Sequence, residues 1–408
     1  MRKALLFIVI LTSPMFGQVG IGTITPSAAL DISSTNDGLL LPRIALNNTT
    51  TATVTTPTVS ELVYNTSTVG DVTPGFYYWD GTKWVRLSIS SSTSSNDWAL
   101  LGNAGTTAGT NFIGTTDNQD LIFKRNNIQS GKISTTNTSL GVNSLAPATS
   151  RNRNTAIGTE AMYLNVNGDD NTAIGYQALR TGTDGVRNVA IGNNTLMDNT
   201  TGGDNTAVGM QSLQSNTTGN NNVAVGRSSL YSNTSGSFNI GIGVAALTSN
   251  TIGNRNIAIG NDALKSSTNK SYNIGIGESA LKNNTVGEYN IAVGSNSMEN
   301  NSGSRNNVLG TFSLRNNTSG SDNTAIGYEV LYRNTTGYSN FAGGYHSLFS
   351  NTKSGGNIGI GYEALTLNTT GNSNVALGYE SLKNNTTAYS NIGIGYQTLF
   401  STTTGGGN

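Results

Sequence analysis

The only histidine is the first residue to consider for chemistry, because imidazole is the commonest general acid or base in proteins. His346 directly follows Tyr345 in a chain of 408 residues. A catalytic triad needs a hydroxyl nucleophile and an acidic group placed around such a ring. No serine nucleophile and acidic partner are recognisable by their spacing from His346. We therefore interpret His346 as a surface substitution and predict no catalytic residue.

Carboxylates are the second candidates, since paired acids perform acid–base work and acidic clusters hold cations. Asp169 and Asp170 are adjacent, and Asp117 lies close to Asp120 in a turn-like segment that could touch a cation. The remaining candidates are single glutamates that form no recurring pair: Glu160, Glu278, Glu329, Glu363 and Glu380. Solvated loops are the commoner setting for such residues. We predict no metal site here, and the absence of cysteine excludes disulfides and thiolate metal sites.

Two Gly-x-Gly triplets, at 241–243 and 359–361, resemble a dinucleotide-binding loop only superficially. They lack the third glycine and the change from strand to helix that bring a helix N-terminus to a pyrophosphate. The triplets therefore indicate repetition, and we predict no cofactor.

An internal repeat sets the positions of all these residues. Its anchor is an asparagine followed four residues later by glycine, as in Asn205 and Gly209, and the repeat holds sixteen complete units from Asn137 onward. Every unit has 17 residues except the one that starts at Asn290, which has 16. A fixed short period is typical of solenoids, in which each coil packs mainly on its two neighbours.

Three positions of the unit, counted from the anchor asparagine, are nearly invariant: asparagine at position one, glycine at position five and leucine or methionine at position nine. We take them as the structural site residues, and in four central units they are Asn171, Asn188, Asn205, Asn222, Gly175, Gly192, Gly209, Gly226, Leu179, Leu196, Leu213 and Leu230. Position four is aliphatic in nearly all units, position three is mostly alanine or glycine, and positions twelve to fifteen often read Asn-Thr-Thr-Gly.

Alternation within Asn-Thr-Ala-Val-Gly at 205–209 predicts a short strand, because residues two apart share a face. We expect positions two and four to form the inward apolar face. Positions one, three and five would then form a small-residue face that could close against sister chains. Leu213 would add a second apolar side chain to each coil, followed by a turn. The leucine segment is compatible with a second strand or with one helical turn. The repeated asparagines suit either a stacked amide ladder or turns alone.

The strand half of the unit resembles a known family. The segments N-T-A-I-G-Y at Asn171 to Tyr176 and N-I-G-I-G-Y at Asn391 to Tyr396 are similar to the N-x-A-I-G head repeats of trimeric autotransporter adhesins of the YadA type. The resemblance covers about two thirds of the chain and implies left-handed parallel β-rolls, three chains side by side. The unit here is longer, because it contains the additional leucine-bearing segment.

Composition agrees with a repetitive, uncharged surface. The chain has 22 basic and 22 acidic residues, so its formal net charge is zero, and it holds 51 glycines. A nucleic-acid-binding protein needs a basic footprint, so we expect no nucleic-acid partner. A 17-residue coil offers few large apolar side chains, so we expect self-association, as a homotrimer.

Four further segments precede the repeat. Residues 1–17 read as a secretory signal peptide, with Arg2 and Lys3 before a short apolar run, and no integral membrane segment is predicted after its removal. Residues 18–87 form a β-rich region, 88–97 a serine-rich linker, 98–136 a β connector with a strand at 121–124, and 137–408 the repeat domain. Residues 18–87 resemble leader regions of exported Bacteroidetes-type fibre proteins, whose longer relatives carry an endosialidase-type intramolecular chaperone.

An aromatic segment closes the 18–87 region, and it predicts a hairpin with its turn at Asp80-Gly81. Its aromatic side chains could stack on sugar, or could form a hairpin core or a trimer contact. They are Phe76, Tyr77, Tyr78, Trp79 and Trp84.

The sequence therefore predicts an all-β protein, a parallel β-solenoid of sixteen coils of about 17 residues. We expect an exported, non-catalytic structural or adhesive fibre, located outside the cell or on the outer surface of a Gram-negative bacterium, with possible cell-surface, matrix or glycan ligands. One alternative is a solenoid that binds an ordered lattice such as ice or polysaccharide. Another is the N-terminal part of a tail-fibre-like protein with a self-cleaving chaperone domain.

Overall fold

The computed structural model describes residues 19–25, 28–51, 53–87, 112–145 and 152–408. The predicted signal peptide, the serine-rich linker and the first part of the connector lie outside these ranges. The chain divides into two compact units, residues 1–113 and residues 114–408, which are treated separately below.

The N-terminal unit contains two small sheets. Strands β1 (Val19–Ile21) and β2 (Leu30–Ile32) pair in parallel. The second sheet has the order β3 (Arg43–Ile44), β4 (Leu62–Asn65), β5 (Gly75–Trp79) and β6 (Trp84–Arg86), in which only β3 and β4 are parallel. Strands β5 and β6 are the predicted hairpin, in which Trp79 pairs with Trp84 across the turn.

The aromatic residues of this hairpin divide between the two faces of the sheet. Tyr77, Trp79 and Trp84 are buried with Leu46, Val63 and Val72. The indole rings of Trp79 and Trp84 meet edge to face, with 5.3 Å between their centroids. Three of the five aromatic side chains that could have bound sugar therefore build the core of the sheet, as the alternative interpretation had it.

A hairpin precedes the solenoid in the C-terminal unit. Strand β7 (Leu121–Arg125) pairs antiparallel with β8 (Ile128–Ile133), and β8 pairs antiparallel with β9 (Asn137–Leu140), the first strand of the repeat. The predicted strand at 121–124 is thus confirmed as β7. Because β8 occupies the free edge of β9, it protects hydrogen-bonding groups that an uncapped solenoid would expose.

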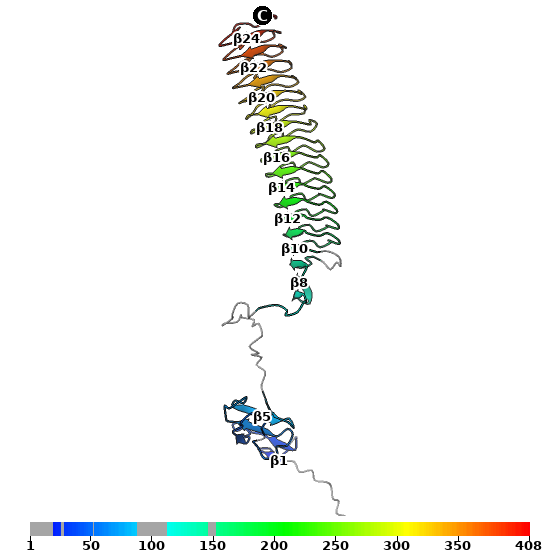
Figure 1. Ribbon diagram of the computed structural model, residues 1–408, viewed down its shortest axis with the longest axis vertical. Helices are drawn as coiled ribbons and strands as arrows, with labels where there is room; N and C mark the ends of the chain where they lie inside the picture. Colours follow the sequence, from blue (N-terminus) through cyan, green and yellow to red (C-terminus); the bar gives the residue numbers. More distant parts are fainter. Residues whose placement is uncertain (1–18, 26–27, 52, 88–111, 146–151) are drawn as a thin grey trace, which may run out of the picture. The chain divides into compact units, whose positions relative to one another are not determined.

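The repeat domain is a parallel β-solenoid, in which each coil contributes one strand to a single ladder (Figure 1). The strands that follow β9 are β10 (Asn154–Ile157), β11 (Thr172–Ile174), β12 (Val189–Ile191), β13 (Thr206–Val208), β14 (Val223–Val225), β15 (Ile240–Ile242), β16 (Ile257–Ile259), β17 (Ile274–Ile276), β18 (Ile291–Val293), β19 (Asn307–Leu309), β20 (Thr324–Ile326), β21 (Phe341–Gly343), β22 (Ile358–Ile360), β23 (Val375–Leu377) and β24 (Ile392–Ile394). Equivalent residues pair throughout, as in Thr206 with Val223, and the shorter unit keeps this register by pairing Ile291 with Asn307.

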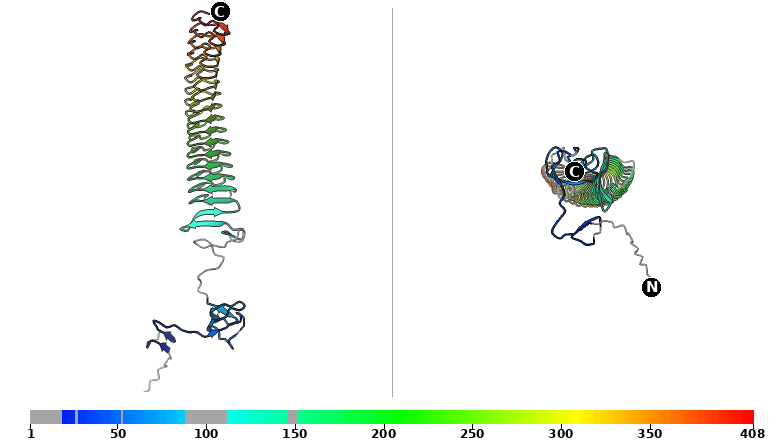
Figure 2. Two further views of the ribbon diagram at one scale, coloured as in Figure 1. Left: turned by 90° about the vertical axis from the view of Figure 1, so that its left-hand side faces the viewer. Right: turned by 90° about the horizontal axis from the view of Figure 1, so that it is seen from below.

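The leucine-bearing half of each coil is neither a second strand nor a helical turn, and no helix occurs in the ranges that the structure describes. Positions seven and nine instead have left-handed backbone, with φ of 60° at Gln211 and 49° at Leu213. This conformation directs their N–H groups toward the neighbouring coils: Gln211 donates to the Asn193 carbonyl at 2.9 Å and Leu213 to the Ser229 carbonyl at 3.0 Å. The coils are therefore hydrogen-bonded on their turning side as well as along the strand, which explains their regular stacking (Figure 2).

Candidate functional site: the solenoid ladders and outer face

The position-one asparagines form a continuous amide ladder inside the solenoid. The Asn188 Oδ1 accepts the backbone N–H of Asn205 at 3.0 Å and its Nδ2 at 3.1 Å. The same Nδ2 donates to the Gly219 carbonyl at 2.9 Å, which ties the start of the coil to its end. Asn222 repeats the arrangement on Asn205 and Gly236, and Asn171 donates to Asn154 and Gly185. These side chains therefore satisfy buried polar groups between coils rather than bind a ligand.

A second amide ladder follows position twelve. Asn216 donates through Nδ2 to Asn199 Oδ1 at 2.7 Å, and Asn233 donates to Asn216 at 2.7 Å. Asn216 also donates to the Gly219 carbonyl at 3.0 Å, the acceptor already used by the first ladder. The ladder is interrupted where Ser267 replaces asparagine, and there Asn250 Oδ1 and Ser267 Oγ are buried without a hydrogen-bond partner. The two ladders show that asparagine stabilises the stack as well as the turns.

Glycine at position five is required by both conformation and space. Gly209 has a φ of 126°, which side-chain-bearing residues rarely adopt. A Cβ atom there would lie 2.8 Å from the Gly226 carbonyl carbon in the next coil, and one on Gly175 would lie 2.3 Å from the Gly192 oxygen. The glycines of successive coils thus form a column in which backbones touch, and no side chain fits.

The position-nine side chains fill the interior. Leu196, Leu213 and Leu230 have no exposed surface, and Leu179 is only 1% exposed. Opposite this column lie the alanines or glycines of position three, and a Cβ on Gly241 would be 3.4 Å from Leu230 Cγ. The interior therefore holds, at each level, one leucine or methionine at position nine beside small side chains, valine being the largest, at positions three and eight.

The predicted orientation of the strand is wrong. Asparagine and alanine at positions one and three are buried, as in Asn205 and Ala207, whereas position two is half-buried and position four faces outward. Ile191 and Ile242 are 37% and 38% exposed. Because leucine and the two amide ladders already occupy the narrow interior, a β-branched side chain at position four has no room inside. The small-residue face is therefore unavailable to sister chains.

We call the outward side chains of positions two and four on strands β9 to β24 the outer face. Position two carries Thr, Val, Ile, Asn or Phe, and position four carries Leu, Ile, Val or a single Gly; neither carries a charge in any coil. Its most exposed members include Ile326 at 45%, Leu309 at 54% and Ile394 at 64%. Contiguous apolar surfaces of this kind are rare on monomeric proteins and mark association sites.

Position eight varies among the coils, yet it is buried. Ser212 and Ser229 have no exposed surface, and their hydroxyls donate to the carbonyls of Ala224 and Gly241 in the next coils. The position carries serine, alanine, threonine and once valine, Val330, because each is small enough for the interior.

A threonine column at position thirteen was missed in the sequence, where Thr-Thr was taken for turn chemistry alone. The Thr217 hydroxyl donates to the Thr234 carbonyl at 2.9 Å, and Thr234 donates to Thr251 at 3.0 Å. Its regular spacing in 17-residue steps was the available signal. These hydroxyls are engaged in holding coils together.

His346 has an acidic partner, contrary to the expectation of none. Its Nε2 lies 2.7 Å from Glu329 Oε2 in the preceding coil, and its ring stacks on Tyr345 with 3.9 Å between centroids. Lys383 bridges Glu363 and Glu380, and the hydrogen bond that it donates to Glu363 is the main reason that the pKa of this lysine is raised well above its usual range. Glu329 and Glu363 therefore contact side chains of adjacent coils, whereas Glu380 pairs with Lys383 in its own coil and accepts a hydrogen bond from Gln397 in the next.

Position seventeen carries bidentate ion pairs between successive coils. Arg187 donates from Nε and Nη2 to the two carboxylate oxygens of Asp204, at 2.6 and 2.8 Å. The hydrogen bond from Arg187 holds the pKa of Asp204 below its ordinary value. Arg153 pairs in the same way with Asp170, so this member of the Asp169–Asp170 pair belongs to a surface ladder.

The cation candidates lie apart from any cluster of ligands. Asp120 Oδ2 forms an ion pair with Lys132 Nζ at 2.5 Å. Within the described ranges, no group of three or more metal-binding side chains comes together. Nor does that part of the chain hold a helix long and apolar enough to cross a membrane.

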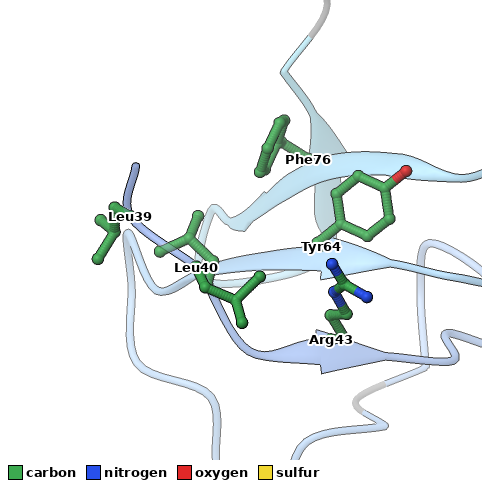
Figure 3. A pocket seen from close by; sticks show the side chains of 6 residues that line it. Leu39, Leu40, Arg43, Tyr64 and Phe76 are labelled. Carbon is green, nitrogen blue, oxygen red and sulfur yellow. The ribbon is translucent and has the colours of Figure 1, made fainter. Parts of the chain in front are cut away.

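A pocket of about 340 Å³ lies in the N-terminal unit, where the segment before β3 passes the exposed face of β4 and β5 (Figure 3). Leu39 and Leu40 are 61% and 74% exposed, and Phe76 is 46% exposed. The Phe76 ring meets Tyr64 edge to face with 5.1 Å between centroids, and Arg43 provides the one charged side chain of the lining. Leucine and aromatic residues make up most of the lining, and an open hollow of this size suits a side chain of a partner.

Comparison with known proteins adds one finding. Residues 20–98 match the family model of a phage tail like trimerisation region, a segment that runs from β1 through β6 and contains the pocket. No curated protein matches the chain. A trimerisation region followed by a β-solenoid fits a tail-fibre-like trimeric protein that associates with itself.

Proposed function

We propose that this chain is the non-catalytic subunit of an exported, homotrimeric fibre that presents a repetitive surface for attachment. The observation that carries the proposal is the match of residues 20–98 to a phage tail like trimerisation region, on the same chain as a sixteen-strand solenoid. The N-terminal unit assembles the trimer and the solenoid forms the shaft or head.

The outer face of the solenoid is the proposed contact between the three chains. It is apolar in every coil except for threonine and one asparagine, Asn307, and it is exposed in the single chain. Three parallel chains in register would bring the same face of each coil together at every level, as cyclic symmetry requires. Burial would remove from water the β-branched side chains that have no room inside a coil. This arrangement replaces the small-residue contact predicted from the sequence.

The pocket beside Leu39 and Leu40 is the proposed contact in the N-terminal unit. Leu39 and Leu40, each more than half exposed, line this hollow together with Tyr64 and Phe76 and give it apolar walls that a second copy could cover. A leucine of one copy in the pocket of the next would close a ring of three identical contacts.

The proposal of a structural role is supported by how the reactive side chains are used. His346, Glu329, Glu363 and Glu380 all take part in contacts between stacked coils. These residues occupy equivalent positions of adjacent units, so each of them can contact the coil next to its own. Export and attachment to an outer surface rest on the amino-terminal sequence alone and remain part of the proposal.

Light scattering on the full-length mature chain during size exclusion tests the trimer. We expect three times the chain mass, and we expect the paired changes Ile242→Asp and Ile259→Asp on the outer face to reduce that mass. The matched control is Asn261→Asp, at the exposed position six. A folded monomer at micromolar concentration would refute the proposal, and antibody labelling of intact cells separately tests surface exposure.

A further inference from the structure

Five consecutive coils at the C-terminal end of the solenoid carry tyrosine at position six, and we call this column the tyrosine ladder. Its members are Tyr328, Tyr345, Tyr362, Tyr379 and Tyr396. Neighbouring rings are stacked almost in parallel, with centroid separations of 5.8, 5.2, 5.0 and 5.2 Å and interplanar angles of 8°, 10°, 7° and 11°. The column thus repeats in step with the coils.

The ladder is exposed along its length. The first four rings are 41% to 43% exposed and Tyr396 is 72% exposed. Because each ring lies face to face with the next, the exposed parts are ring edges and phenol hydroxyls. Each hydroxyl can both donate and accept a hydrogen bond. The surface offered to a ligand is therefore a straight row of hydroxyls on an apolar base, one for each coil.

Charged side chains next to the ladder are already paired. Glu329 accepts from His346 at 2.7 Å, Lys383 binds both Glu363 and Glu380, and Gln397 donates to Glu380 at 2.7 Å. A charged ligand would have to displace these partners, at the cost of leaving a carboxylate or ammonium group less well satisfied. A neutral ligand with many hydroxyls matches the surface better.

Position six lies outside the proposed contact between chains. This inference rests on the proposed function. In earlier coils the same position carries Arg227, Asn261 and Glu278. In a parallel, in-register trimer every coil makes the equivalent contact, and charged residues are depleted from the buried centre of an interface. A position that holds arginine and glutamate in some coils therefore faces solvent in all of them, including the five with tyrosine.

We propose that the tyrosine ladder binds an extended neutral polysaccharide that lies along the solenoid, with about one sugar ring at each coil. A sugar polymer presents hydroxyls and C–H groups at a regular interval comparable to the separation of the stacked rings. Each tyrosine contributes a weak contact, and five contacts on each of three chains combine by multivalency. The other position-six side chains provide no comparable run, so the site is restricted to residues 328–396.

Two binding measurements on the full-length protein test the proposal. The first is its retention on insoluble cellulose and chitin, and the second is its retardation in gels that contain soluble neutral glucan, xylan or mannan. We expect wild-type protein to bind at least one of these polymers. The triple change Tyr345→Ala, Tyr362→Ala and Tyr379→Ala should weaken binding on the order of tenfold or more, since several contacts are lost together. The matched control, Met210→Ala with Val244→Ala, alters exposed position-six side chains in other coils and should bind normally.

Light scattering accompanies each binding measurement. Failure of the wild-type protein to bind any of these neutral polymers would overturn the proposal, as would equal loss in the control variant. Loss of the trimer in the triple variant would also overturn it, because the ladder would then be a contact between chains. A monomeric wild-type protein that binds through the ladder would refute the proposed trimer and leave the polysaccharide site standing.

Discussion

Leucine at position nine provides the most direct test of how a coil is built. Leu264 has no exposed surface, and the leucines at position nine of the two adjacent coils, Leu247 and Leu281, are equally buried. Its backbone N–H donates to the Ala280 carbonyl at 3.0 Å. In the variant Leu264→Asp, the carboxylate replaces an aliphatic side chain, and no basic side chain is buried in the described ranges to pair with it.

The expected cost has two parts. Loss of a buried leucine side chain typically costs about 2–5 kcal/mol, and burial of a carboxylate without a partner adds several kcal/mol unless the group is protonated. The sum is comparable to the entire stability of an ordinary domain, about 5–15 kcal/mol. In a solenoid the loss falls on one coil and its two neighbours, so the stack should open near residues 239–289 while distant coils persist.

Hydrogen exchange resolved along the chain, together with thermal melting, measures this effect. We expect fast exchange confined to the coils around position 264 and a lower, broader melting transition. Leu264→Met is the packing control, because methionine occupies position nine at Met162 and Met298, and such swaps usually cost less than about 1.5 kcal/mol. Asn261→Asp controls for the added charge. Wild-type melting and exchange in Leu264→Asp would refute our account of the interior.

Two further changes test the polar ladders. Asn233→Ala removes the hydrogen bonds donated to Asn216 and Gly236 and the one accepted from Asn250. At roughly 1 kcal/mol for each bond, we expect the free energy of unfolding, measured in urea, to fall by about 2–3 kcal/mol. Ser267→Asn should raise this free energy, because the new amide can donate to the unpartnered Asn250 oxygen. If both variants had the stability of the wild-type protein, the amide ladder would contribute nothing to the free energy of unfolding. Arg187→Gln tests the surface pairs: the pKa of Asp204 is depressed in the folded state, so its stabilisation exists above its ordinary pKa of 3.8 and is lost as the pH falls through the depressed value. Because the pair is exposed, we expect the melting temperature of Arg187→Gln to differ only slightly from that of the wild type at pH 7, and the difference should disappear in strong acid. A difference that does not change with pH would show that the Arg187–Asp204 pair is not its cause.

Local features followed readily from the sequence. The 17-residue period, the strand at each anchor, the hairpin around Asp80-Gly81 and the buried leucine column all depend on interactions between residues close in the chain or at equivalent positions of adjacent units. Such patterns reveal themselves by repetition, because every coil must satisfy the same local geometry. The structure also shows that the position-five glycines form a line of backbone contacts, in which a Cβ atom would collide with the backbone of the next coil.

Other features required the coil to be closed in three dimensions. Left-handed backbone at positions seven and nine occurs at residues such as Gln211 and Leu213, whose types give no signal of it. It is maintained by hydrogen bonds to neighbouring coils. The pairing of His346 with Glu329, 17 residues away, likewise depends on the stacking that brings one variable position above the next.

The repeat by itself determined that each unit is one solenoid coil with a strand, a leucine and a glycine corner. Alternation along that strand shows two faces but not which of them points inward, and hydrophobicity favoured the wrong one. Only the tertiary structure decided this, because the width of the closed coil admits alanine opposite leucine and excludes isoleucine. The most apolar side of the strand, with Ile191, Ile242 and their equivalents, is consequently left outside, where a sister chain can cover it.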